Sequence, residues 1–175
     1  MAAPSLGCAA RRASWWDAYA DRFVANDGRV MDDARQGGGH SEGQAWGMLL
    51  AVRAGDEVGF DLIRGWTMRH LACRRDTLLA WSFEAVKGVA DRNNATDADL
   101  YHALALAEAD RAWPWKGTLA EAKRIADDCL RLLLRRWQGM ALLLPGATGF
   151  EGWRHLDVNP SYILPHVFAR LHALT

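Results

Sequence analysis

Residues 41–52 have the sequence Ser-Glu-Gly-Gln-Ala-Trp-Gly-Met-Leu-Leu-Ala-Val, and they carry more structural and functional signal than any other stretch of the chain. The apolar run that starts at Trp46 predicts a helix. Ser41 is a suitable N-cap for this helix, and Gln44 stands three residues later, where its side chain can reach back to complete a capping box. Glu42 would then lie in the first helical turn. A carboxylate held there can be a catalytic proton donor or an ordinary residue that stabilises the positive end of the helix dipole.

Helical periodicity continues through most of the chain, and almost no segment alternates as a strand would. We predict helices at residues 15–24, 42–54, 58–71, 79–89, 97–109, 118–137 and 160–174. Thr96 and Thr118 are suitable N-caps for two of them, because each is followed by an acid three residues later. The glycine-rich residues 140–157 predict a long loop with room for a short hairpin. Seven antiparallel helices with short links indicate an all-α fold of the α/α type.

Composition narrows the functional classes. The 175 residues fit one domain, and 21 basic residues balance 21 acidic ones, so no strong field directs the chain to nucleic acid or to an acidic membrane. Cys8, Cys73 and Cys129 lack the spacing of metal ligands, and the six histidines are scattered. No apolar run approaches the roughly 18 residues that span a bilayer. We therefore predict no metal, no cofactor, no nucleic-acid partner and no membrane span.

Four further motifs accompany the stretch that contains Glu42. They are Gly28-Arg29-Val30-Met31-Asp32, Asn94-Ala95-Thr96-Asp97-Ala98-Asp99-Leu100, Leu144-Pro145-Gly146 with Gly149-Phe150, and Asn159-Pro160-Ser161-Tyr162. In this order and spacing, the five motifs resemble the first half of a glycoside hydrolase family 8 enzyme. The resemblance is strongest to the endo-1,4-β-glucanase, a cellulase, that accompanies bacterial cellulose synthase. It runs from about Trp15 to about Leu171, which is nearly the whole chain.

This resemblance implies an (α/α)6 barrel, in which outer helices surround inner ones and the active cleft lies at one end. The chain supplies about half of the helices of such a barrel. We therefore expect residues 15–175 to form a partial catalytic domain, and residues 1–14 to be a disordered leader or the remnant of an export signal. Half a barrel exposes its inner helix faces, which favours self-association or a partner protein.

The family resemblance also implies a reaction. An inverting glycosidase uses one carboxylic acid as proton donor and a second carboxylate to activate water, and the two stand roughly 6.5–9.5 Å apart. Glu42 matches the general acid of the family. Asp97 matches the aspartate that lies near this acid and contacts the sugar ring undergoing cleavage. The family's general base lies in a Ser-Tyr-Asp-Ala-Ile-Arg-like element, and residues 1–175 contain no such element.

Other residues are expected to bind substrate. Asp99 either contacts the sugar or merely caps its helix. Tryptophan rings offer flat apolar faces to β-linked glucose, and Trp46, Trp81 and Trp113 stand near helix starts and loops, where a cleft could use them. Tyr162 lies in a motif that borders the cleft in the family. The tryptophans predicted to lie in the core are Trp15, Trp66 and Trp137.

Two interpretations of the chain remain. The first is a hydrolase of β-1,4-glucan, periplasmic or secreted as the family normally is, that carries the general acid but lacks the general base within these residues. The second is a truncated, non-catalytic remnant that keeps the acid motif and binds glucan or another protein. Release of reducing ends from a soluble cellulose, with and without Glu42, distinguishes them.

Overall fold

The computed structural model describes residues 14–173, and this part of the chain is mostly helical. Its α-helices are α1 Ser14–Phe23, α2 Ser41–Ala54, α3 Glu57–His70, α4 Thr96–Ala112, α5 Leu119–Leu133 and α6 Pro165–His172. Short 3-10 helices occur at η1 Asp33–Arg35, η2 Pro114–Lys116 and η3 Pro160–Tyr162. Within the described residues, no helix is long and apolar enough to cross a bilayer.

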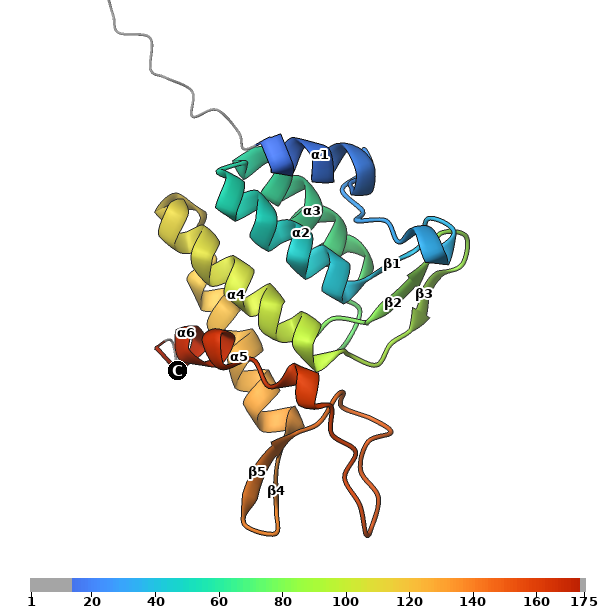
Figure 1. Cartoon of the computed structure of the whole chain (residues 1–175), viewed down its shortest axis with the longest axis vertical. Helices are drawn as coiled ribbons and strands as arrows, with labels where there is room; N and C mark the ends of the chain where they lie inside the picture. Colours follow the sequence, from blue (N-terminus) through green and yellow to red (C-terminus); the bar gives the residue numbers. More distant parts are fainter. Residues whose placement is uncertain (1–13, 174–175) are drawn as a thin grey trace, which may run out of the picture.

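Two small antiparallel sheets accompany the helices. The first has the strand order β1-β2-β3, formed by β1 Gly39–His40, β2 Ser82–Glu84 and β3 Gly88–Asp91. It lies beside the start of α2 (Figure 1). The second sheet pairs β4 Leu134–Trp137 with β5 Met140–Leu143 and projects away from the helices (Figure 1). The expected all-α class is thus present as a mostly helical fold, to which these two short sheets are added.

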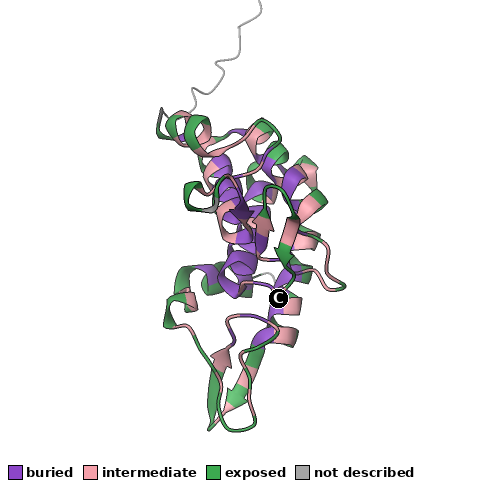
Figure 2. Cartoon of the chain, turned by 90° about the vertical axis from the view of Figure 1, so that its right-hand side faces the viewer, coloured by how far each residue is buried: buried purple, intermediate pink, exposed green. Residues whose placement is uncertain are grey.

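Helix α4 is the centre of the hydrophobic core. It packs against α2 on one side and α5 on the other, and α2 also contacts α3. Residues on every face of α4 are buried, which is expected of a helix that other elements surround. Small side chains on this helix, such as Ala98, Ala103 and Ala105, are fully buried and let neighbouring helices approach closely. Figure 2 shows this buried centre as a continuous band through the helices.

The predicted helix at residues 79–89 is wrong, because this segment is extended and forms most of the β2–β3 hairpin. Its backbone groups find partners elsewhere in the fold. The N–H of Leu79 donates to Asp99, that of Ala80 donates to the carbonyl of Leu71, and that of Trp81 donates to the carbonyl of Asn93. Backbone groups satisfied by distant residues have no need of a helical turn.

Two other helix boundaries also differ from the sequence-based expectation. The predicted helix at 118–137 ends at Leu133, because Gln138 and Gly139 both adopt positive φ values and turn the chain into the β4–β5 hairpin. The predicted helix at 160–174 begins as η3 and resumes as α6 only at Pro165. A proline has no N–H to donate within a helix and therefore favours the first turn.

The ends of the chain and its first helix complete the fold. The leader expected at residues 1–14 falls almost entirely outside the described residues. Trp15, predicted as a core residue, is exposed, whereas the neighbouring Trp16 is buried and donates its indole N–H to Asp56 at 2.8 Å. Successive residues on a helix point about 100° apart. Trp15 and Trp16 therefore face different sides of α1, and only Trp16 faces the core.

Candidate active site

The first turn of α2 carries Glu42, but its cap differs from the predicted capping box. His40 is the N-cap, and its Nδ1 atom accepts a hydrogen bond from the N–H of Gly43 at 3.0 Å. Ser41 lies inside the helix and its side chain is buried, while its backbone N–H donates to the carbonyl of Trp81 at 2.9 Å. Gln44 is fully buried and does not reach back to the cap. The extended backbone of His40 places the cap one residue earlier than expected.

A pocket of about 190 Å³ opens at this helix end. Its lining residues come from the loop before α2, from α2 itself, from the segments before β2 and α4, and from η3. They are Asp32, His40, Ser41, Glu42, Trp81, Ala95 and Tyr162. Backbone hydrogen bonds hold these segments together, because the segment at Trp81 binds Ser41 on one side and Asn93 on the other. The structure thus brings predicted residues Glu42, Trp81 and Tyr162 to one place.

Asp97 lies in the first turn of α4 and is buried beside this pocket. Burial raises the pKa of the Asp97 carboxyl, and the negative charge of Glu42 raises it further. A side-chain hydrogen bond from Tyr162 acts in the opposite direction and favours the ionised carboxylate. Burial also raises the pKa of the Tyr162 hydroxyl, with the charges of Asp97 and Glu42 adding to it. Glu42, Asp97 and Tyr162 therefore form one electrostatically coupled group.

Asp99, expected either to contact sugar or to cap its helix, makes its side-chain hydrogen bonds inside the protein. Its side chain is 0% exposed, and both of its oxygens accept hydrogen bonds inside the protein, from the N–H of Leu79 at 2.9 Å and from Nδ2 of Asn94 at 2.8 Å. Burial raises the pKa of this carboxyl to about 7. Asn94 in turn accepts from the N–H of Ala147 at 2.7 Å. Asp99 therefore fixes the segments that precede Trp81 and Ala95.

The three candidate tryptophans have different surroundings. Trp81 lines the pocket, and its indole N–H donates to Asp91 at 2.8 Å. Trp46 is 38% exposed and packs on the ring of Tyr101, with centroids 4.3 Å apart. Trp113 is only 8% exposed and belongs to the core, where its ring lies against Phe60, and it is not among the residues that line the pocket. It is the C-cap of α4, and its position at that helix end places its ring in the core.

Four residues that line the pocket were not among the predicted site residues, and two of them, Asp32 and His40, have titratable side chains. Asp32 stands in the Gly-Arg-Val-Met-Asp motif, which was noted only as part of the resemblance. His40, which by its place beside the Glu42 motif is either a substrate contact or a solvated loop residue, is part of the pocket wall. Its position next to the Ser-Glu-Gly-Gln motif was the available signal. Among the described residues, no group of three His, Cys, Asp or Glu side chains is arranged to bind a metal ion.

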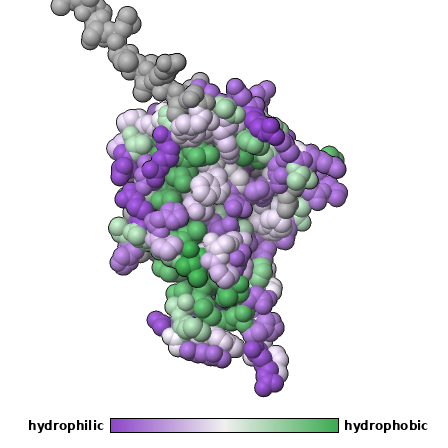
Figure 3. Space-filling model, viewed as in Figure 1, coloured by the Kyte–Doolittle hydropathy of each residue, from purple (hydrophilic) through white to green (hydrophobic). Residues whose placement is uncertain are grey.

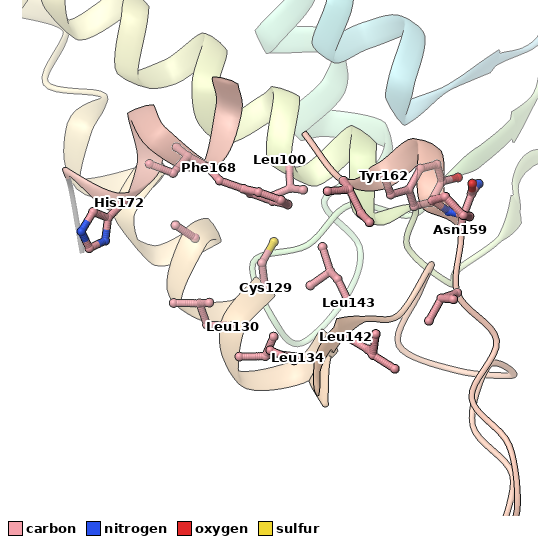
Figure 4. Close-up of a pocket in the computed structure, with 16 residues that line it drawn as sticks. Leu100, Cys129, Leu130, Leu134, Leu142, Leu143, Asn159, Tyr162, Phe168 and His172 are labelled. Carbon is pink, nitrogen blue, oxygen red and sulfur yellow. The ribbon is translucent and has the colours of Figure 1, made fainter. Parts of the chain in front are cut away.

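A second and larger cavity, of about 470 Å³, is apolar. Side chains of α5, of the β4–β5 hairpin and of α6 line it, among them Cys129, Leu142, Leu143 and Phe168, and Tyr162 lies at its edge (Figure 4). Hydrophobic residues gather over the same part of the molecule in Figure 3. Tyr162 belongs to both cavities, so the apolar groove and the acidic pocket adjoin each other.

Known proteins resemble this chain in sequence and in structure. The family model of the glycosyl hydrolases family 8 matches residues 1–173. An endoglucanase of Cellulomonas uda is 36% identical over 151 residues, which cover 85% of this chain and 42% of that protein. The crystal structure of an endoglucanase from Komagataeibacter sucrofermentans is 37% identical with a TM-score of 0.87, covering 91% of this chain and 51% of that one.

A family 8 endoglucanase from Klebsiella pneumoniae gives a TM-score of 0.88 at 34% identity, and the match covers 91% of this chain and 52% of that one. The chain thus spans about half the length of the relatives that it matches. Its described helices correspond to about half of the (α/α)6 barrel of the family. The extent of the family match, together with the shared fold, shows that this chain belongs to the glycosyl hydrolases family 8.

Proposed function

We propose that this chain provides the general-acid side of a site that hydrolyses internal β-1,4-glucosidic bonds in cellulose or a related β-glucan, by an inverting mechanism. In this proposal Glu42 protonates the leaving oxygen, and Asp97 contacts the sugar ring at the cleavage point. The observation that carries the proposal is the pocket in which half-buried Glu42 lies near buried Asp97, with Trp81 and Tyr162 in its wall.

The chemistry of the pocket suits such a substrate. Burial and the negative charge of Glu42 both raise the pKa of the Asp97 carboxyl, so the two acidic groups of the site interact electrostatically. The ring of Trp81 offers an apolar face to the C–H groups of a glucose unit. The hydroxyl of Tyr162 and the carboxylate of Asp32 are polar groups in the same wall, suited to the hydroxyls at the edge of the sugar.

An inverting reaction also requires a carboxylate that activates water. The resemblance to the family locates it in the Ser-Tyr-Asp-Ala-Ile-Arg-like element, which residues 1–175 do not contain. General-base catalysis is typically worth about 10²–10⁴-fold in rate. We therefore expect these residues alone to bind glucan but to cleave it far more slowly than a chain that also contains the base element. Because a glucan polymer is too large to enter a cell, the proposed place of action is the periplasm or the cell exterior.

Hydrolysis tests the proposal directly. Reducing ends released from carboxymethylcellulose are measured for the chain, for a longer form that contains the base element, and for the variants Glu42→Gln and Glu57→Gln. Glu57 is a matched control, because it lies in the first turn of α3 and outside the pocket. We expect release by the longer form and by that form carrying Glu57→Gln, and a loss of about 100-fold or more when the longer form carries Glu42→Gln. Equal release by the longer form with and without Glu42→Gln would remove the support for Glu42 as acid.

The alternative function is binding without cleavage, and the missing base element favours it for these residues taken alone. Titration with cellohexaose, followed by NMR shifts of the amides of Glu42, Trp81 and Ala95, reports binding independently of hydrolysis. A longer form that binds the oligosaccharide at this pocket and releases no reducing ends would establish the binding function in place of the enzymatic one.

A further inference from the structure

The N-cap of α2 is a histidine, although Ser, Thr, Asp and Asn are the residues that usually cap helices. A histidine can accept a hydrogen bond only through a ring nitrogen that carries no proton. Because Nδ1 of His40 accepts from the N–H of Gly43, the capping ring is neutral and carries its proton on Nε2. The cap therefore depends on the protonation state of a side chain that titrates near physiological pH.

Asp32 lies on the other side of this ring. Its Oδ2 atom is 3.7 Å from Nε2 of His40, while its Oδ1 atom accepts from the N–H of Ala34 at 2.9 Å. The backbone N–H of Asp32 also donates to the carbonyl of Gly38 at 2.9 Å. This carboxylate is thus held by its own loop in a position that favours a proton on Nε2, so that Nδ1 is the nitrogen that accepts from Gly43.

The capped turn is the one that carries the proposed general acid. The N–H group that donates to His40 belongs to Gly43, the residue directly after Glu42. Asp32, His40 and Glu42 also line the same pocket. When the cap is lost, the first turn of α2 loses a hydrogen bond that fixes the direction in which Glu42 points.

We propose that His40 is a positioning residue for Glu42. In its neutral form it caps the first turn of α2, and Asp32 selects the tautomer that makes this possible. The catalytic consequence rests on the function proposed above for Glu42, whereas the cap and its dependence on pH do not. As pH falls and the ring gains its second proton, the acceptor at Nδ1 disappears and the first turn loosens.

The charged groups around His40 have opposite effects on the protonation of its ring. Asp32 and Glu42 favour the protonated ring, and both line the pocket with it. The positive end of α2 disfavours it, as does Arg29, whose side chain lies beside Gly39. On the side of β2, His40 pairs with Ser82, which carries no charge. Since removal of a neighbouring carboxylate favours the neutral imidazole, Asp32→Asn is expected to move the titration of His40 to lower pH.

The test uses the full chain without substrate. Titration of His40 is followed by the ¹⁵N shifts of its ring, and hydrogen exchange of the Gly43 amide is measured over the same pH range and corrected for intrinsic exchange. We expect both curves to share one midpoint, with Gly43 protected above it. His40→Ala should lower this protection about fivefold at high pH. His40→Asn, which supplies an acceptor that does not titrate, should restore protection and make it independent of pH.

Several outcomes would overturn the proposal. One is a Gly43 amide in His40→Ala that is as well protected as in the parent chain. Another is His40→Asn with the same pH-dependent loss of protection as the parent. If His40→Ala does not fold, the parent chain, His40→Asn and Asp32→Asn still test the proposal. The cap predicts that Asp32→Asn moves the midpoint of Gly43 exchange to lower pH, and an unchanged midpoint would contradict it. Hydrolysis by Glu42→Gln tests the function separately, so failure of one claim does not conceal failure of the other.

Discussion

The backbone N–H of Ser41 donates a hydrogen bond to the carbonyl oxygen of Trp81 at 2.9 Å. This bond joins the first turn of α2, which carries Glu42, to a segment forty residues later in the chain that supplies an aromatic wall of the pocket. Trp81 in turn binds the carbonyl of Asn93, which leads into the turn that carries Asp97. The pocket therefore depends on a continuous set of backbone contacts between segments that are distant in sequence.

The buried carboxyl of Asp99 should give stability a specific dependence on pH. Its pKa rises from an ordinary value of 3.8 to about 7 in the folded chain, so the folded state binds this proton more tightly than the unfolded state does. This contribution to stability is therefore complete below about pH 4 and declines as pH rises towards 7, by on the order of 1 kcal/mol per pH unit.

Urea denaturation of the parent chain and of Asp99→Asn between pH 4 and pH 8 measures this effect. Asparagine does not titrate, so the difference in unfolding free energy between the two proteins should change across this range in favour of the variant. A constant difference would show that Asp99 keeps its ordinary pKa in the fold.

Two buried threonines should differ in their effect on glucan binding while costing similar stability. Thr96 donates its hydroxyl to the carbonyl of Leu144 at 2.6 Å, and Thr118 donates to that of Leu106 at 2.8 Å. Replacement of either by valine leaves a buried carbonyl without this donor, and each should lower the unfolding free energy by about 1–2 kcal/mol. Only Thr96 adjoins the pocket segment, at Ala95 and Asp97, so we expect weaker cellohexaose binding in Thr96→Val alone. Calorimetry measures the affinity for cellohexaose, and thermal denaturation measures stability. If lost stability were the cause of weaker binding, both variants would bind cellohexaose equally weakly.

Trp81 should contribute to glucan binding because its ring lies in the pocket, whereas an exposed tryptophan outside the pocket should not. Trp81→Ala removes a wall of the pocket and is expected to weaken binding about fivefold or more, since stacking on an aromatic ring is worth about 1 kcal/mol. Trp115 is the matched control. It is 71% exposed, and its indole also donates to a carboxylate, that of Glu57, but it lies outside the pocket. Similar losses in Trp81→Ala and Trp115→Ala, measured with cellohexaose, would contradict a specific role for Trp81.

The apolar groove between α5, α6 and the β4–β5 hairpin should cause self-association of this chain. Ile163 is 64% exposed and Leu130 is 51% exposed at its edge, and burial of such surface against a second copy is favourable. We expect Leu130→Glu with Ile163→Glu to shift the chain towards monomer in sedimentation velocity experiments. Val86→Glu is the control, because Val86 is 97% exposed on the turn of the other hairpin. An unchanged distribution in the double variant would exclude the groove as the interface.

Much of the fold follows from local sequence. The apolar run after Glu42 and the helical periodicity of residues 97–109 and 118–137 each predict a helix that the structure contains, although the last of these ends at Leu133. These patterns depend on the 3.6-residue period of a helix, which a chain expresses without reference to distant residues. Pro165 likewise marks the start of α6, because its ring permits only a first-turn position.

The segment before β2 and the surroundings of Asp99 depend on residues that lie elsewhere in the sequence. Residues 79–89 have no strong strand pattern, and they are extended because Asp99, Leu71 and Asn93 satisfy their backbone groups. In the same way, Asp99 is a typical first-turn acid in sequence, but the fold buries it against Leu79 and Asn94.

The sequence alone determined the positions of most helices and the motifs through which the chain resembles its family, because both depend on residues close together in the chain. Tertiary structure alone decided which of the candidate residues share a pocket. It placed Asp32 and His40 beside Glu42 and withdrew Asp99 and Trp113 into the interior. The physical reason is that the burial of a side chain and the charges near it are set only when α2, α4 and the segment at Trp81 pack together. No local sequence pattern predicts this packing.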